Sequence, residues 1–151
     1  DDYKTRFPGI TTFLAECVEV AKRHGYVETI LKRRRPIPEI ESNQPNRRSL
    51  AERTAINSVV QGSAADLIKV AMVDLHDRLS PHAIDRRDAR EPEIEGVRML
   101  LQIHDELVLE APIDRAKAVR ELVVERMRGA MELRVPLEVE SAVSGNWYGG
   151  K

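Results

Sequence analysis

The feature that most constrains this sequence is an apolar segment interrupted at its centre by ionisable residues. Between Val97 and Glu110, runs of leucine, isoleucine and valine lie on both sides of His104-Asp105-Glu106. Short runs of β-favouring residues separated by a few polar residues predict strand, turn, strand. We therefore expect a hairpin whose buried strands hold Asp105 rigidly at an exposed tip.

A carboxylate held in this way suits a metal ligand. Mg²⁺ prefers carboxylate oxygens in near-octahedral geometry, and two-metal phosphoryl transfer needs rigid ligands because its ions lie about 4 Å apart. The simpler alternative is a polar turn with no further role. A second His-Asp pair, His76-Asp77, also raises the HD-type metal phosphohydrolases. Their His-Asp lies in an all-helical setting, whereas Asp105 is expected between strands.

The remaining periodicity predicts an α+β fold with a small antiparallel sheet packed against long helices. Capping is expected from Thr11 or Thr12 in the first helix, from a capping box at Ser49 in the second, and from Asp114 in the third. Gly25 should end the first helix. A loop containing Pro45 should precede the second helix, and Gly62 could divide that helix in two. The predicted elements are a helix over 10–21, a strand over 26–31, a helical stretch over 49–79, a polar loop over 81–96, a helix over 115–131 and a last strand over 137–143.

Positive charge is concentrated in one part of an otherwise balanced chain. The whole chain has a formal net charge of −1, but Lys22 to Arg53 contains nine Lys and Arg against four Glu. Such a strip is typical of a local phosphate contact, although a solvated loop would look the same. The single cysteine, Cys17, fits a reducing, intracellular compartment, and no apolar run approaches membrane-spanning length.

Three polar residues at intervals of four follow the predicted long helix. Arg53, Asn57 and Gln61 form a slanted stripe, because each step of four turns a helix by only about 40°. The stripe could be an ordinary solvated face. It could also present hydrogen-bond donors to the DNA minor groove, whose acceptors occur at every base pair.

Together these segments resemble family A DNA polymerases. Three blocks match in order, and the resemblance covers nearly the whole chain. The matching blocks are Gly25-Tyr26-Val27-Glu28-Thr29 with Arg33-Arg34-Arg35 and Pro38, then Ala51-Glu52-Arg53 with Asn57 and Gln61-Gly62-Ser63-Ala64-Ala65-Asp66 with Lys69, and finally Gln102-Ile103-His104-Asp105-Glu106-Leu107-Val108. The last block resembles motif C of that family.

The resemblance implies that residues 1–151 form the C-terminal part of a polymerase domain, palm with adjoining fingers elements, in the bacterial cytoplasm at the nucleoid. Asp105 would be a catalytic Mg²⁺ ligand and Glu106 the adjacent catalytic carboxylate. Primer–template DNA would be contacted by the remaining matching residues, which are Arg33, Arg34, Arg35, Arg53, Asn57, Gln61 and His104. Deoxynucleoside triphosphates would bind mostly through upstream residues, and no membrane partner is expected.

Two substitutions depart from the family pattern, and two motifs are absent. Lys32 stands where the family usually has Gly, and Val59 where it usually has Pro. The family's first metal-binding aspartate and its nucleotide-gripping helix lie upstream and do not occur here. We therefore expect the chain alone to be inactive. A non-catalytic DNA-binding module remains an alternative, since such a module would not need Asp105.

Overall fold

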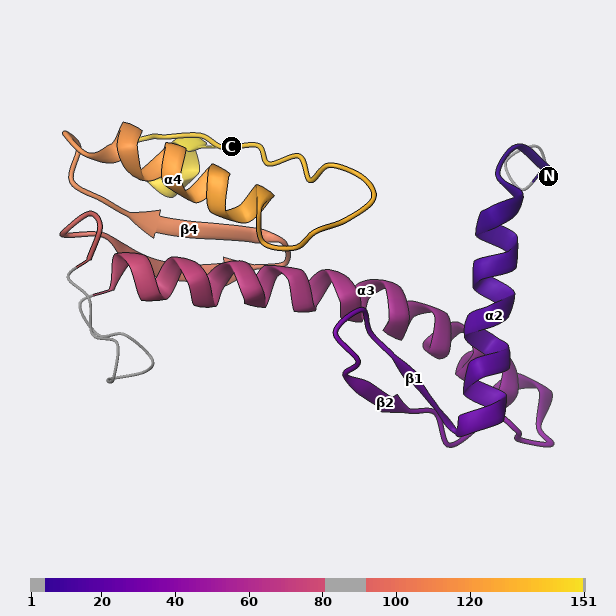
Figure 1. Cartoon of the computed structure of the whole chain (residues 1–151). Coiled ribbons are helices and arrows are strands. Elements are labelled where there is room, and N and C mark those ends of the chain that lie inside the picture. Colours follow the sequence, from indigo (N-terminus) through magenta and orange to yellow (C-terminus); the bar gives the residue numbers. More distant parts are fainter. Residues whose placement is uncertain (1–4, 81–91, 151) are drawn as a thin grey trace. The chain divides into compact units, whose positions relative to one another are not determined.

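The computed structural model describes residues 5–80 and 92–150. The chain divides into two compact units, Asp1–Asp66 and Leu67–Lys151, and the boundary falls within helix α3. Within the described residues each unit contains one two-stranded antiparallel sheet, β1–β2 in the first and β3–β4 in the second (Figure 1). The mixture of helices and small antiparallel sheets confirms the predicted α+β class.

The first unit opens with α2, Pro8–His24. It begins at Pro8, earlier than the predicted threonine caps, because proline suits a first helical turn. Thr12 instead donates its hydroxyl to the Pro8 carbonyl at 3.3 Å. Gly25 ends the helix as predicted, with φ 74° and its amide 2.8 Å from the Ala21 carbonyl oxygen.

The predicted strand over 26–31 is shorter than expected and has an unforeseen partner. β1 covers Tyr26–Glu28 and pairs antiparallel with β2, Arg34–Pro36. Residues 29–33 form the turn between them, and Lys32 adopts the left-handed φ of 64°. Lysine thus keeps the conformation that the family's usual glycine would adopt freely, at a cost of about 1–2 kcal/mol.

Helix α3 runs from Pro45 to Leu79 as one continuous element. The expected loop around Pro45 and the capping box at Ser49 are wrong, because proline is tolerated at a helix start and Ser49 lies inside the helix. Gly62 does not divide it. Val59, in place of proline, leaves the backbone ladder intact and packs against the first unit's core. That core comprises Ala21, Val27, Ile37, Ile40, Ala51 and Ala55.

The second unit contains the predicted hairpin. β3, Arg98–Ile103, pairs antiparallel with β4, Glu106–Glu110, and an irregularity lies between Met99 and Leu101. Helix α4 covers Ala116–Arg128, and a 3₁₀ turn, η2, covers Trp147–Gly150. The α4 N-cap is Arg115, without a side-chain cap bond, so the predicted Asp114 cap is wrong.

The core of the second unit packs the hairpin against helices. Leu75 and Leu79 of α3 pack with Val97, which directly precedes β3, and with Val119 of α4. The partly buried residues around them include Met99, Leu107, Leu109, Leu122 and Met127. The predicted last strand over 137–143 is wrong: its alternation finds no partner strand among the described residues. The expected 81–96 loop lies outside the described residues up to 91. No helix in the described ranges is long and apolar enough to cross a membrane.

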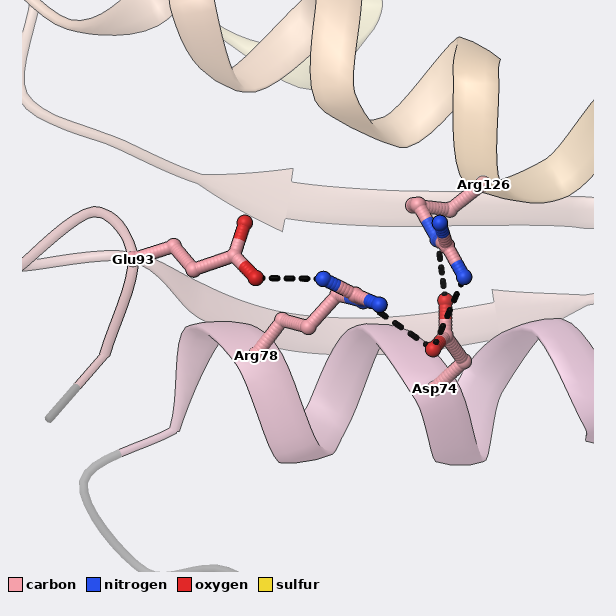
Figure 2. Close-up of polar contacts among 4 residues, drawn as sticks. All are labelled: Asp74, Arg78, Glu93 and Arg126. Carbon is pink, nitrogen blue, oxygen red and sulfur yellow. Dashed lines mark hydrogen bonds and ion pairs between the residues drawn. The ribbon is translucent and has the colours of Figure 1, made fainter. Parts of the chain in front are cut away.

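An ion-pair network links three segments of this unit (Figure 2). Asp74 of α3 accepts from Arg126 Nε at 2.6 Å and from Arg78 Nε at 3.0 Å. Arg78 also pairs with Glu93, whose amide donates to the Arg78 carbonyl at 2.8 Å. Partial burial acts to raise the pKa of Asp74, but the bonds from Arg126 and Arg78 outweigh it and lower the pKa.

We predict that Asp74→Asn destabilises this protein by about 1–2 kcal/mol, because both arginines lose a charged acceptor in a partly exposed setting. The lowered pKa means that the stabilisation is present above the unfolded-state value and lost as pH falls through the folded-state value. Urea unfolding at neutral and acid pH measures this. Glu121→Gln, in the exposed pair with Lys117, is the control. An Asp74→Asn variant no less stable than the control would contradict the prediction.

Candidate functional site

The hairpin tip comprises His104, Asp105 and Glu106. The prediction that buried strands carry it is wrong: Met99, Leu107 and Leu109 pack partly buried against the core, whereas Leu100 and Leu101 are 52% and 48% exposed. Ile103 pairs with Glu106, so His104 and Asp105 form the two-residue turn. His104 has a left-handed φ of 55°, a conformation that costs energy for a residue with a side chain. The side-chain amide of Gln102 donates to the His104 carbonyl, which ties the turn to β3. The packing of β3 and β4 on the core and the Gln102 bond to the turn therefore hold the backbone of Asp105 in place.

The tip side chains are free to meet a ligand. His104, Asp105 and Glu106 are exposed, and their side chains form no hydrogen bond or ion pair with other described residues. Two adjacent carboxylates offer the oxygen donors that a hard divalent cation prefers. Within residues 5–80 and 92–150 no group of three metal-ligating side chains occurs, so this part supplies only part of a ligand set.

The donor stripe, Arg53, Asn57 and Gln61, lies on α3 in the first unit. Because α3 is continuous, the three residues share one slanted helix face, as the spacing predicts. All three are exposed and have no partner among the described residues. Their donors are thus available to an external acceptor. The stripe and the hairpin tip belong to different units, and each is placed within its own unit.

The arginine cluster, Arg33, Arg34 and Arg35, is not uniform. Arg34 donates to Glu28 at 3.0 Å and lies over the Tyr26 ring, 4.6 Å from its centroid. The bond from Arg34 is the main cause that lowers the pKa of Glu28. Arg35 is exposed and has no partner among the described residues. Arg35 is therefore the member most available to a phosphate.

Arg33 is committed to α3 instead. Its Nε and Nη2 atoms both lie 2.9 Å from Asp66 Oδ1, and Nη2 also donates to the Gly62 carbonyl at 3.1 Å. Asp66 is 5% exposed. The Thr29 hydroxyl, then Arg33 and the Leu31 amide, outweigh burial and lower its pKa. Asp66 belongs to one of the blocks that match the family, but the sequence does not predict its pairing with Arg33, because the two residues meet only in the folded chain.

Comparison with known proteins identifies the family. The profile of DNA polymerase family A matches residues 1–149, and the chain belongs to that family. It is 46% identical over 149 residues to DNA polymerase I of Geobacillus stearothermophilus and equally to the thermostable DNA polymerase I of Thermus aquaticus, covering 99% of this chain. The chain spans 16% of the length of each of these curated relatives.

A solved structure agrees with this assignment. The POL domain of Pol1 from M. smegmatis, in complex with DNA primer-template and dNTP, superposes with a TM-score of 0.75 at 41% identity. The match covers 90% of this chain and 22% of that one. The family excludes the HD-type phosphohydrolase alternative, in keeping with the position of Asp105 in a β-turn rather than on a helix.

The close approach of Thr29 to α3 generates a prediction. A Cβ added at Gly62 would lie 2.7 Å from Thr29 Cγ2, closer than two carbons tolerate. We predict that Gly62→Ala displaces residues 29–33, although alanine favours helix by about 1 kcal/mol. Thr29→Ser removes Cγ2 and keeps the hydroxyl, so the double variant should regain wild-type stability or exceed it.

Thermal unfolding of both single variants and the double variant measures this effect. The control is Gly145→Ala, since nothing lies within 4 Å of the Cβ position at Gly145. If Thr29→Ser did not improve the Gly62→Ala variant, the methyl contact would not be the constraint.

Proposed function

We propose that this chain forms part of the active site of a DNA-directed DNA polymerase, a nucleotidyltransferase that extends a primer on a DNA template. The observation that carries the proposal is the Asp105 carboxylate, which has no partner among the described residues and lies at a braced hairpin tip in a family A chain. The complex of the M. smegmatis relative with primer-template and dNTP supports the same partners for the parent protein. We place that parent in the bacterial cytoplasm, at the nucleoid.

Asp105 and Glu106 fit a divalent cation. Both are exposed, and neither is engaged by a described arginine or lysine, so their oxygens can face a metal ion. We propose Asp105 as a ligand of Mg²⁺ and Glu106 as the neighbouring catalytic carboxylate, with further ligands from elsewhere in the parent. In two-metal sites such ions stabilise the attacking and leaving oxygens of the displacement.

The donor stripe is proposed to hold the primer–template. Donors that reach purine N3 or pyrimidine O2 sense a correctly shaped pair without reading its sequence. Asn57 and Gln61 would make these contacts near the primer end, with Arg53 and His104 in supporting or primer-side positions. The arginine cluster would lie near the nucleic-acid backbone, where the guanidinium of Arg35 has no partner among the residues that the structure describes. Phosphoryl-transfer enzymes work mainly by positioning and charge neutralisation, and these residues would supply the positioning.

Asp105→Asn in the parent should reduce nucleotide addition by about 100-fold or more while primer–template affinity stays near wild type. An amide is a neutral and poorer metal ligand. Single-turnover primer extension and DNA titration measure the two effects, with Glu110→Gln at the far end of the same hairpin as control. Near-normal extension by Asp105→Asn would favour a non-catalytic DNA-binding module.

Gln61→Ala in the parent should lower extension about threefold to tenfold, the equivalent of one hydrogen bond. A primer whose terminal base lacks its minor-groove acceptor should slow the wild type and leave Gln61→Ala little changed. Asn46→Ala, an exposed polar residue of α3 outside the stripe, is the control. An equal response of wild type and Gln61→Ala to the altered base would show that Gln61 does not touch that acceptor.

The 151-residue chain alone should not extend a primer, because its described residues hold only one partial ligand set, at the hairpin tip. The assay combines purified chain, primer–template, Mg²⁺ and all four nucleotides, with Asp105→Asn as control. Extension that depends on Asp105 would show that the chain holds a complete site.

A further inference from the structure

We infer that Arg33 is a positioning residue that clamps the connection between β1 and β2 onto α3, and so fixes the helix turn that carries Gln61. The inference rests on the proposed minor-groove role of Gln61. It assigns to Arg33 a task different from the phosphate contact expected of the arginine cluster. The connection, residues 29–33, is called the docked loop below.

The docked loop meets α3 through three separate contacts besides the methyl contact at Gly62. The guanidinium of Arg33 holds Asp66 and the Gly62 carbonyl. The Ile30 amide donates to the Ser63 hydroxyl at 2.9 Å, and that hydroxyl donates in turn to the Val59 carbonyl at 2.6 Å. The docked loop thus binds one turn of α3 through the side chain of Arg33 and through the backbone amide of Ile30.

These contacts lie beside Gln61, so they can affect the position of its side chain. Gly62 follows Gln61 directly, and Val59 lies two residues before it. A serine that bonds the carbonyl four residues earlier commonly bends a helix, so the local course of α3 at Gln61 depends on how Ser63 and the Gly62 carbonyl are held. Because a shift of about 1 Å away from the chemistry can cost about 100-fold in rate, the clamp bears directly on the reach of Gln61.

The chemistry of the clamp requires arginine rather than positive charge alone. Asp66 is almost fully buried, and a buried carboxylate needs a well-placed partner. One planar guanidinium reaches Asp66 Oδ1 and the Gly62 carbonyl together, whereas a lysine ammonium is a single point charge on a flexible stem. Arg33→Lys therefore removes the clamp while it preserves the net charge that a phosphate contact would need.

The test uses the full-length parent polymerase and compares Arg33→Lys and Asp66→Asn with wild type. Arg115→Lys is the matched control, since Arg115 is an ion-paired arginine of similar exposure outside the proposed site. Hydrogen exchange of the 26–37 peptide measures docking. The ratio of extension rates on primers with and without the terminal minor-groove acceptor measures alignment, because general destabilisation lowers both rates and leaves their ratio unchanged. Salt dependence of DNA binding measures phosphate contacts.

Arg33→Lys and Asp66→Asn should speed exchange in the docked loop, including the Ile30 amide. Both should reduce the acceptor-dependent ratio toward that of Gln61→Ala, a loss of about threefold to tenfold. The log–log salt slope should stay at the wild-type value in Arg33→Lys and fall by about 0.9 in Arg35→Ala, because Arg35 is exposed and pairs with none of the described residues.

An Arg33→Lys enzyme with wild-type exchange and ratio, in an assay where Gln61→Ala shows its effect, would overturn the inference. Faster exchange with an unchanged ratio would also overturn it, since the clamp would then be structural only. If Gln61→Ala itself had no effect on the ratio, the minor-groove part of the proposed function would fail and the positioning role would fall with it. The Asp105→Asn result would be unaffected.

Discussion

The contact between Thr29 and Gly62 is the constraint on which the arrangement of the first unit depends. A helix surface with a side chain at position 62 could not accept Thr29 this closely. The approach brings Arg33 within reach of Asp66 and the Ile30 amide within reach of Ser63. The bond and ion pair from Arg33 to Asp66 Oδ1 offset part of the cost of burying this carboxylate. The absence of a side chain at Gly62 thus lets residues 29–33 lie close enough to α3 for Arg33 to pair with the buried Asp66.

In the second unit the main constraint is different: the carboxylates of Asp105 and Glu106 are exposed, while the hairpin that carries them is held by packing. Apolar residues of β3 and β4 pack on Leu75, Leu79 and the α4 residues around Val119. His104 in the two-residue turn has a left-handed φ, which costs energy. The packing of the β3 and β4 residues on the core offsets this cost. Asp105 and Glu106 therefore stay exposed at the tip, unpaired with other described residues, while packing and the Gln102 bond hold the backbone that carries them.

The sequence predicted the elements whose signals are local. Apolar runs around a polar pair predicted the hairpin, and Gly25 predicted a left-handed helix end. β2 was missed because Arg34–Pro36 is exposed and contains no strong β-former, so only its pairing with β1 defines it. The alternation over 137–143 suggested a strand, but alternation cannot supply a partner. For the site, spacing alone placed the donor stripe on one face, whereas the engagement of Arg33 by Asp66 depends on the fold and could not be read from its position.

The central claim is that the Asp105 carboxylate is a metal ligand in the parent polymerase. The most direct test is to count bound Mn²⁺, which shares the oxygen preference of Mg²⁺, by electron paramagnetic resonance titration. The sample is the parent with primer–template and an incoming nucleotide, as wild type, Asp105→Asn and Glu110→Gln. We predict that Asp105→Asn binds about one ion fewer, or binds it at least about tenfold more weakly, while Glu110→Gln matches wild type. Identical Mn²⁺ isotherms for wild type and Asp105→Asn would contradict the claim.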